Sequence, residues 1–383
     1  MSDSPLRLTR RRTLQAMAGT FAALALSGVD TAQAAAAKDP KNKYPSKVVD
    51  LVQRSIVIDM LGPLKLDFRP EAYSVPLTEA EAAMFRSSGI TAFHNSVGVG
   101  GFGAYDDALQ FIAAWSGFCG RNSDVFSLVG RAQDIDHAKA TQKIAVIMGL
   151  QNADEFREPK EVKAFYELGL RCAQLTYNSQ NFIGSGSTER VDGGISDYGI
   201  EIIKAMNEVG MLIDVSHSGD RTTLDAIELS PKPIAFTHSN CRALNNHPRL
   251  KTDEAIKKLA AKGGVMGITG VRMFVKDEEP TTVEDIVDHI DHVVKLVGIE
   301  HVGIGTDSDL MGYDHMPADQ YKQLKAGYKA SYAFRDKIDT DDFNHPRKMY
   351  DLTAALMRRG YSDSNIQAIL GGNFRRLLGS TWT

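Results

Sequence analysis

Short apolar runs alternate with amphipathic helical patterns along most of this 383-residue chain. Two of the runs, residues 144–150 (IAVIMGL) and 264–270 (GVMGITG), are almost continuously apolar. Strands of a parallel sheet have this composition because helices cover both of their faces. The runs that we interpret as strands are residues 56–60, 90–97, 144–150, 172–176, 212–216, 233–237, 264–269 and 301–306.

Helical patterns follow nearly every predicted strand, at residues 79–86, 106–118, 161–168, 198–209, 221–229, 252–262 and 283–297. Eight β/α units in roughly 350 residues predict an α/β fold, a (β/α)8 TIM-type barrel. Residues 349–358 and 364–378 predict extra C-terminal helices, and the polar stretch 309–340 predicts an irregular lid. A doubly wound open sheet is the alternative, but no GxGxxG motif follows the first strand.

Residues 1–34 have the features of an export signal. Residues 9–15 (TRRRTLQ) are close to the twin-arginine pattern, the apolar stretch 16–29 is too short to span a bilayer, and Ala32-Gln33-Ala34 is a cleavage site. We therefore expect export to a bacterial periplasm by the twin-arginine route, with no stable membrane insertion after cleavage. A polar linker, residues 35–48, then leads into a barrel domain that spans residues 49–383.

The composition argues against several kinds of partner and site. A net charge of −4 gives no bulk attraction for nucleic acid or for an anionic membrane. The three cysteines, Cys119, Cys172 and Cys241, are scattered and form no CxxC pair. The sequence therefore predicts neither a disulfide framework nor a zinc knuckle, and Cys172 and Cys241 are expected in or near the core.

Polar side chains stand at the carboxyl ends of the predicted strands, namely Asp59, His94, Asn95, Gln151, Asn152, Tyr177, Asn178, His217, His238, Asp307 and Asp309. In a parallel barrel these ends form one rim, where ligands bind. Imidazoles and carboxylates on one rim favour zinc or a similar ion, which suits hydrolytic chemistry. The alternative is that His217 and His238 are satisfied loop histidines. A structural or surface role is favoured for six other histidines, namely His137, His289, His292, His301, His315 and His345.

Several motifs on this rim resemble a known family. They are Asp214-Val215-Ser216-His217, Thr237-His238-Ser239-Asn240-x-Arg242-Ala243-Leu244, His247-Pro248-Arg249, Leu175-Thr176-Tyr177-Asn178, Gly303-Ile304-Gly305-Thr306-Asp307 and Gly372-Asn373-x-x-Arg376. Together they are similar to the renal (membrane) dipeptidases, the M19 metallopeptidases, and the resemblance is colinear from about Val49 to Leu378. The resemblance implies a (β/α)8 barrel, a binuclear zinc site and hydrolysis of dipeptides, often with tolerance for a D-residue at the second position.

The resemblance also implies roles for individual residues. His217 and His238 match the two histidines that hold one zinc ion. Arg249 matches the arginine that binds the substrate carboxylate, and Asp307 matches the aspartate near the substrate amine and the attacking water. Tyr177 stands where the family has a substrate-contacting histidine. We therefore assign Tyr177, Asn178 and Arg249 to substrate binding, and Tyr177, Arg249 and Asp307 to catalysis.

Three positions depart from the pattern of the family. Leu61 and Pro63 occupy the places of the His-x-Asp pair that binds the other zinc ion, and Gln151 occupies the place of the bridging glutamate. The leucine and proline side chains carry no ligand atom, and a neutral amide does not offset the repulsion between two cations. We expect a divergent branch in which one zinc ion is favoured over two, held by His217 and His238. Gln151 and Asp59 are the further candidate ligands.

These observations predict a metal-dependent hydrolase of dipeptides or related small amides. The expected partner is this small-molecule substrate, and a homodimer is one expected assembly. The alternative is a catalytically degenerate barrel that binds a small carboxylated ligand without hydrolysing it.

Overall fold

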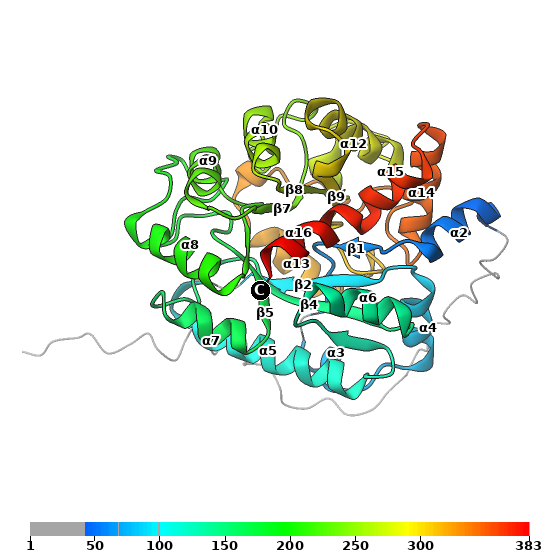
Figure 1. Cartoon of the computed structure of the whole chain (residues 1–383), viewed down its shortest axis with the longest axis horizontal. Helices are drawn as coiled ribbons and strands as arrows, with labels where there is room; N and C mark the ends of the chain where they lie inside the picture. The colour runs from blue at the N-terminus through cyan, green and yellow to red at the C-terminus, as the bar shows by residue number, and fades with distance from the viewer. Residues whose placement is uncertain (1–42, 68, 99, 383) are drawn as a thin grey trace, which may run out of the picture. The chain divides into compact units, whose positions relative to one another are not determined.

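Eight parallel strands form a closed ring in the computed structural model of the chain, which describes residues 43–67, 69–98 and 100–382 (Figure 1). The strands are β1 (Ile58–Asp59), β2 (Ala92–Val97), β4 (Ile144–Leu150), β5 (Leu170–Gln174), β6 (Leu212–Asp214), β7 (Ala235–Ser239), β8 (Val265–Ile268) and β9 (Val302–Ile304). Their order around the ring is β2-β1-β9-β8-β7-β6-β5-β4, and β4 pairs with β2 to close it. The predicted (β/α)8 TIM-type barrel is confirmed.

One further strand lies beside the ring and was not predicted. The strand β3 (Phe126–Leu128) pairs with the first half of β4, where Phe126 lies opposite Ile144. The second half of β4 pairs with β5, where Met148 lies opposite Leu170. Three residues are too few to show the alternation that marks a strand in a sequence.

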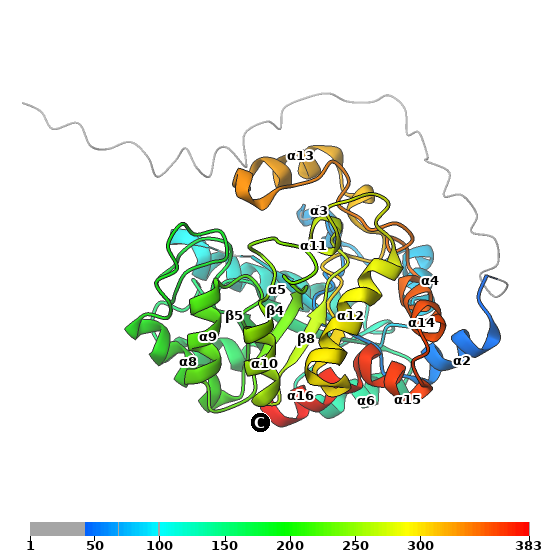
Figure 2. The same cartoon turned by 90° about the horizontal axis from the view of Figure 1, so that it is seen from above.

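Helices surround the ring in two perpendicular views (Figures 1 and 2). Each predicted helix has a counterpart among those that flank the strands, which are α4 (Glu79–Ser87), α5 (Ala104–Arg121), α7 (Glu161–Glu167), α8 (Asp197–Val209), α9 (Asp220–Leu229), α10 (Asp253–Ala261), α12 (Val283–Val297) and α14 (Lys348–Arg358). Further helices are α2 (Ser46–Arg54), α3 (Pro70–Ser74), α6 (Ala132–Ala140), α11 (Arg272–Val275) and α15 (Asp363–Gln367). Local chemistry sets several of these ends. Thr78 and Glu81 form a capping box at the start of α4, and Gly210 ends α8 at φ 80°.

The last helix, α16 (Asn373–Thr381), closes the amino end of the barrel. Phe374, Leu377 and Leu378 pack in one cluster with Ile58, Ala92, Ala145, Ala235 and Val265, which lie at or next to the first residue of their strands. Asn373 adds hydrogen bonds of 2.7 Å to the carbonyls of Ile299 and Val302. The helix α16 therefore leaves the carboxyl end of the barrel uncovered, which is the end where the sequence predicts the ligand site. The predicted extra C-terminal helices are present as α14, α15 and α16.

The polar stretch 309–340, here called the lid, is more regular than predicted. It contains the helix α13 (Ala318–Ala326), which lies at the opposite end of the barrel from α16 (Figure 2). Its aromatic residues pack into a small core of their own with residues that follow β8. The helix was missed because its apolar residues are few and stand between charged ones.

The folded part of the chain begins before the predicted domain boundary at residue 49. Tyr44 is only 8% exposed; its hydroxyl donates to Asp351 at 2.6 Å and its ring packs on Tyr350. The helix α2 begins at Ser46, inside the predicted linker. The predicted signal, residues 1–34, lies outside the described residues. Within residues 43–67, 69–98 and 100–382, no helix combines the length and the apolar character that crossing a membrane requires.

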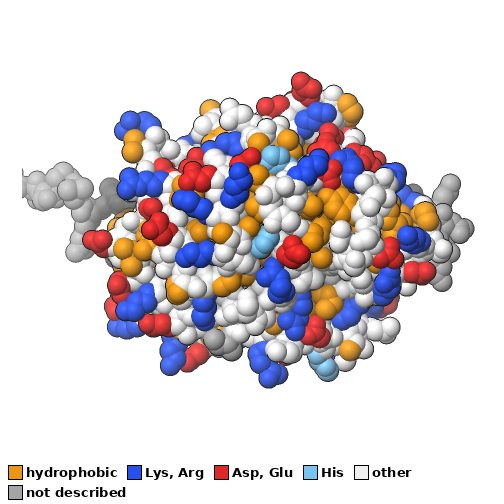
Figure 3. Space-filling model, turned by 45° about the horizontal axis from the view of Figure 1, so that its top comes forward, with side chains coloured by type: hydrophobic (Ala, Val, Ile, Leu, Met, Phe, Trp, Pro, Cys, Tyr) orange, Lys and Arg blue, Asp and Glu red, His pale blue; other side chains and the backbone are white. Residues whose placement is uncertain are grey.

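Acidic and basic side chains are interspersed on the face shown in Figure 3. Many of them form ion pairs between neighbouring helices. Arg359 at the end of α14, for example, binds Asp288 and Asp291 of α12 at 2.7 and 2.6 Å. Exposed pairs of this kind each stabilise a fold by at most about 1 kcal/mol, so the core rather than the surface holds the barrel together.

Candidate active site at the carboxyl end of the barrel

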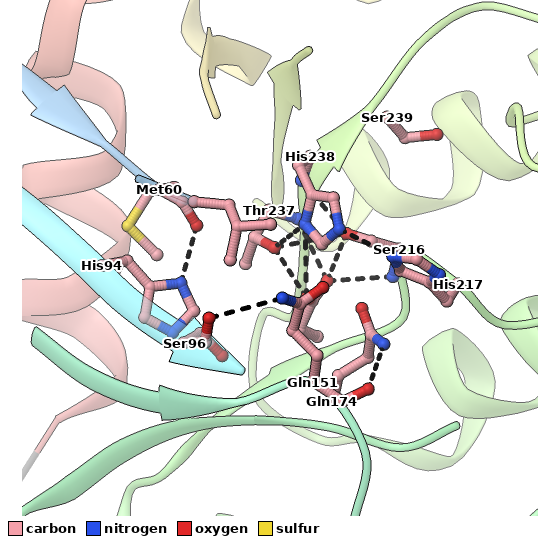
Figure 4. A network of polar contacts seen from close by, with 12 residues as sticks. Met60, His94, Ser96, Gln151, Gln174, Ser216, His217, Thr237, His238 and Ser239 are labelled. Atoms are coloured by element: carbon pink, nitrogen blue, oxygen red, sulfur yellow. Dashed lines mark hydrogen bonds and ion pairs between the residues drawn. The ribbon is translucent and has the colours of Figure 1, made fainter. Parts of the chain in front are cut away.

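His217 and His238 face each other at the carboxyl ends of two neighbouring strands (Figure 4). The strand β6 leads into His217, and β7 contains His238. The Nε2 atoms of the two rings are 2.9 Å apart, and both side chains are buried. The structure thus brings together the two imidazoles that the sequence places on one rim.

The hydrogen bonds of the two Nδ1 atoms determine which ring nitrogens carry hydrogen. His217 Nδ1 lies 2.7 Å from the amide oxygen of Asn178, which can only accept, so Nδ1 donates. His238 Nδ1 lies 2.7 Å from the hydroxyl of Thr237. That hydroxyl donates to Asp214 at 2.6 Å, so it accepts from His238. Each Nε2 atom is therefore left with a bare lone pair, and the two lone pairs point toward each other.

Two facing lone pairs repel unless a positive ion lies between them. A shared proton would require one ring to be an imidazolium. Burial lowers the pKa of both histidines well below the usual value, and the nearby Arg249 guanidinium lowers it further. A histidine that binds a metal ion usually donates its other ring N–H to an oxygen, as both rings do here. The pair therefore fits two ligands of one divalent metal ion.

The Asp214 carboxylate joins the two strand ends that carry the histidines. One of its oxygens accepts from the main-chain nitrogens of Ser216 and Thr237 at 2.9 and 3.0 Å and from the Ser216 hydroxyl at 2.6 Å. The other oxygen accepts from the Thr237 hydroxyl. Asp214 is 1% exposed, so these bonds satisfy a carboxylate that is removed from water.

Two buried cations bind the main chain of the same segments. Arg249 donates from Nη1 to the carbonyl of Ser216 and from Nη2 to the carbonyl of His238, the latter at 2.9 Å. Lys251 donates to the carbonyls of Val215 and Ser218 at 2.7 and 2.9 Å. Arg249 is 1% exposed, but its Nε has no hydrogen-bond partner in the described part of the chain. Part of the guanidinium that was predicted to bind a substrate carboxylate is thus used to hold the histidine loops.

A third imidazole on the rim also has a bare nitrogen. His94 Nδ1 donates to the carbonyl of Met60 at 2.6 Å, and its Nε2 is buried without a partner among the described residues (Figure 4). The ring lies over Gly149 of β4, where a Cβ atom would come 1.8 Å from Nε2. Only glycine leaves room for the His94 ring at this place. The sequence showed His94 on the rim but not this contact, which joins residues far apart in the chain.

The two further candidate metal ligands are engaged in other contacts. Gln151 donates weakly from Nε2 to the carbonyl of Ser96, at 3.5 Å. Both oxygens of Asp59 accept from Thr306, from its main chain at 2.8 Å and from its hydroxyl at 2.6 Å. Burial raises the pKa of Asp59 to about 6. The Asp59 carboxylate therefore ties β1 to β9, as Asp214 ties β6 to β7, and it does not join the histidine pair.

The metal-binding group is smaller than the sequence prediction allowed. In the described part of the chain, no three side chains of the His, Cys, Asp or Glu types come close enough together to hold a metal ion. Leu61 is fully buried, and its main-chain carbonyl accepts from Asp307 at 2.8 Å. The fit to a metal ion therefore rests on His217 and His238.

Tyr177 and Asn178 contact His217 from different directions. The Tyr177 ring stacks on the imidazole with ring centroids 4.2 Å apart, while Asn178 binds Nδ1. Asn178 is buried and does not line the cavity described below. It was predicted to bind substrate, and in the structure its amide oxygen orients His217. The Tyr177 hydroxyl lies 2.7 Å from the hydroxyl of Tyr328 in the lid.

A small cavity separates Tyr177 from the lid. Its volume is about 30 Å³, which has room for about one water molecule. Asp307 is the acidic residue of its lining, and the others are aromatic or aliphatic: Tyr177, Val271, Met273, Phe274, Tyr313, Leu324, Tyr328, Tyr332, Phe334 and Ile338. The ring of Tyr177 lines this cavity and covers His217, so a substrate reaches the histidines only after that ring moves.

Asp307 has the properties of a proton acceptor at neutral pH. Burial raises its pKa to about 7; the carboxylates of Asp59 and Asp214 add to the rise, and Arg249 opposes it. Its backbone has φ 59°, which is uncommon for a residue other than glycine. This conformation lets the main-chain nitrogen of Asp307 donate to Leu61 while its side chain lines the cavity.

A larger cavity, of about 410 Å³, lies elsewhere on the rim. Its lining includes Leu64, Leu66 and Asp67 after β1 and Asp309 and Met316 at the start of the lid. The charged groups around it are paired with each other, as Lys65 is with Glu81 at 2.9 Å. None of the three imidazoles with a bare nitrogen lines either cavity, but the smaller one is lined by Asp307 and by Tyr177, which stacks on His217, so it is the better candidate for the active site.

The histidines for which the sequence favours a structural or surface role take no part in the cavity lining. His289 is buried, bonds the carbonyl of Val275 at 2.8 Å and accepts from the main chain of Cys241. His301 bonds the carbonyl of Gly264 at 2.9 Å, and His345 pairs with Asp351. The three cysteines are free and buried, and for Cys172 and Cys241 this agrees with their expected place in or near the core.

Comparison with known proteins identifies the family. The family model for membrane dipeptidase (peptidase family M19) matches residues 47–326, which is most of the chain. This chain belongs to the membrane dipeptidase family. Dipeptidase verJ of Clonostachys rogersoniana is 31% identical over 263 residues, 68% of this chain and 61% of that protein. Dipeptidase tcpJ of Claviceps purpurea is 28% identical over 67% of this chain and 55% of that protein. The membrane dipeptidase region thus spans less than two thirds of these relatives.

Solved structures support the membrane dipeptidase fold. An amidohydrolase from Pseudomonas aeruginosa superposes with a TM-score of 0.77 at 32% identity, over 88% of this chain and 99% of that one. A metallo peptidase from Rhodobacter sphaeroides, liganded with a phosphinate mimic of the dipeptide L-Ala-D-Ala, has a TM-score of 0.68 at 18% identity, over 86% of this chain and 100% of that one. At that identity the second likeness shows the fold alone.

The hydrogen-bond pattern makes a prediction about metal binding. On addition of Zn²⁺, the ¹⁵N resonances of both Nε2 atoms are expected to shift, with Nδ1 remaining protonated in His217 and in His238. Thr237→Val removes the acceptor of His238 Nδ1 and is expected to weaken Zn²⁺ binding about 10–100-fold in calorimetric titration. Thr141→Val, at the exposed end of α6, is the matched control. Protonated Nε2 atoms in the Zn²⁺-saturated protein would contradict this assignment.

Proposed function

We propose that this protein hydrolyses dipeptides or related small amides at the carboxyl end of the barrel, using one zinc ion held by His217 and His238. The observation that carries the proposal is the pair of bare Nε2 atoms 2.9 Å apart in a buried setting. Such an arrangement is costly without a positive ion, and it follows directly from the orientation that Asn178 and Thr237 give to the two rings.

A reduced site with one ion rather than two has separate support. Leu61 and Pro63, which align with the ligands of the other zinc ion in the resemblance, carry no ligand atom. Asp59 uses both oxygens on Thr306. Gln151 is our candidate for a third ligand, because its amide nitrogen makes only a 3.5 Å contact with Ser96 and can turn. On this view the protein represents a divergent branch of the family that lacks the His-x-Asp pair and the bridging glutamate.

The residues around the histidines have different roles in hydrolysis. Zinc supplies Lewis acidity, which activates water and polarises the amide carbonyl. Asp307 takes a proton from the attacking water and returns it to the leaving amine, which a pKa of about 7 allows in both directions. The unpartnered Nε of Arg249 is available for the substrate carboxylate. Tyr177 moves off His217 to admit the substrate and then shields it from bulk water.

The turnover of dipeptides tests the proposal. With Zn²⁺ added, the purified protein is expected to cleave a panel of dipeptides, with one equivalent of metal per chain by elemental analysis. His217→Ala should lower kcat/KM by more than about 100-fold, because it removes one of two imidazole ligands. His137→Ala, on the exposed face of α6, is the control and should retain activity. Two equivalents of metal, or activity that survives both His217→Ala and a chelator, would contradict the proposal.

Asp307 predicts the pH dependence of the reaction. The carboxylate form accepts the proton, so kcat/KM should fall about tenfold per pH unit below its pKa of about 7 and level off above it. Asp307→Asn is expected to remove this limb of the profile together with most of the activity. Asp319→Asn, on the exposed side of α13, should leave the profile intact. A native profile that is flat between pH 5.5 and 8 would rule out this role.

A second candidate function is binding of a small carboxylated ligand without hydrolysis. It is favoured by the metal-binding group of only two side chains in the described residues and by the Tyr177 ring that covers His217. This candidate predicts dipeptide binding that neither Zn²⁺ nor His217→Ala changes. Calorimetry on the native protein and on that variant separates it from the proposed hydrolase.

We also propose that the protein works in a bacterial periplasm after export by the twin-arginine route. The support is the arginine run at residues 10–12, with the apolar stretch and the cleavage site that follow it. Changing Arg10 and Arg11 to lysine should keep the protein in the cytoplasmic fraction, whereas Lys38→Arg in the predicted linker should not. Export of the double variant at the native level would contradict this route. The homodimer remains a prediction, which light scattering can check.

A further inference from the structure

We propose that the lid makes the enzyme selective for substrates whose amino-terminal residue has a large apolar or aromatic side chain. This inference rests on the proposed function, since it names the substrate class of the same site. It is carried by the chemical character of the cavity lining and by the way the lid is held over Tyr177.

The underside of the lid is a continuous aromatic surface. Tyr328 stacks on Tyr332 with ring centroids 4.5 Å apart, and Phe334 lies 4.9 and 5.0 Å from these two rings. Tyr332 also contacts Phe274, which follows β8, at 5.5 Å. These rings, with Leu324 and the aliphatic residues after β8, form most of the cavity lining. A side chain that enters the cavity therefore meets aromatic rings and aliphatic groups, together with the neutral hydroxyls of the tyrosines.

Charge in this lining is confined to one place. The hydroxyls of the four tyrosines in the lining, Tyr177, Tyr313, Tyr328 and Tyr332, are neutral near pH 7, because the ordinary pKa of a tyrosine is about 10. Because Asp307 is the acidic residue of this lining, it is the group there that can pair with the substrate ammonium, and the side chain of the amino-terminal residue then shares the cavity with it. A charged side chain would find no partner of its own there, and its desolvation would be costly.

The size of the cavity shows how selection works. A volume of about 30 Å³ has no room for an amino-acid side chain, so the lid must move when a substrate binds. The hydroxyls of Tyr177 and Tyr328, 2.7 Å apart, join the lid to the ring that covers His217. Opening the lid breaks this contact and uncovers the histidine. A large apolar side chain offsets the cost of opening the lid, because it packs against the aromatic surface of the lid.

Substrate preference provides the test. For the native protein with Zn²⁺, kcat/KM for Leu-Ala and Phe-Ala is expected to exceed that for Ala-Ala at least about tenfold, with Asp-Ala below Ala-Ala. Leu324→Asp places a charge in the lining and should abolish the preference for Leu-Ala. Lys322→Asp, on the exposed side of the same helix, should preserve it. Tyr328→Phe keeps the ring and removes the hydroxyl that holds the lid closed, so opening should cost less and KM should fall by a similar factor for all substrates while the preference remains.

The outcomes distinguish the lid from the catalytic site. Equal kcat/KM for Leu-Ala and Ala-Ala, an unchanged preference in Leu324→Asp, or loss of the preference in Tyr328→Phe would each overturn the inference while leaving hydrolysis intact. If no dipeptide is cleaved, the proposed function fails, and the selectivity of the lid is then tested by dipeptide binding. In that case calorimetry with the His217→Ala variant should still show tighter binding of Leu-Ala than of Ala-Ala, and equal binding would refute the selectivity.

Discussion

The hydrogen bond from the Thr237 hydroxyl to the Asp214 carboxylate determines the chemistry of this site. A hydroxyl has one hydrogen, and because the carboxylate takes it, the oxygen of Thr237 can only accept from His238. That single constraint leaves the Nε2 atom of His238 bare. Asn178 imposes the same state on His217 from the other side. The ability of the pair to bind a cation thus comes from residues that would not touch the cation themselves.

The same arrangement, a buried carboxylate that accepts hydrogen bonds from a threonine, occurs twice on the rim with different results. Asp59 receives the main-chain and side-chain hydrogens of Thr306, just as Asp214 receives those of Thr237. In the half that contains Asp214, the neighbouring strand includes His238. In the half that contains Asp59, the buried Leu61 stands two residues after the carboxylate. The barrel therefore keeps the support for two similar sites, although only one half presents imidazole nitrogen. Strand pairing alone explains why these carboxylates are buried, so a buried acid on this rim is a poor guide to a metal ligand.

The sequence predicts the features that local patterns determine. The eight strands of the ring and the position of His217 and His238 follow from apolar runs and from the rule that parallel strands end on one rim. The strand β3 has only three residues, and α13 has few apolar ones, so neither gives a recognisable period. The positions of Asn178 and Arg249 depend on contacts between distant parts of the chain. Motif resemblance assigns these two residues to the substrate, but it does not show that they also hold the histidines and their loops.

The close contact between His94 and Gly149 limits how this barrel can change. Any side chain at residue 149 would collide with the imidazole, and a smaller residue at 94 would leave a void beside a glycine in the middle of β4. The two positions are therefore expected to vary together, although 55 residues separate them in the chain. A side chain at residue 149 alone would force the His94 ring out of its present position. Exchanging them as a pair gives access to side chains that the present geometry forbids.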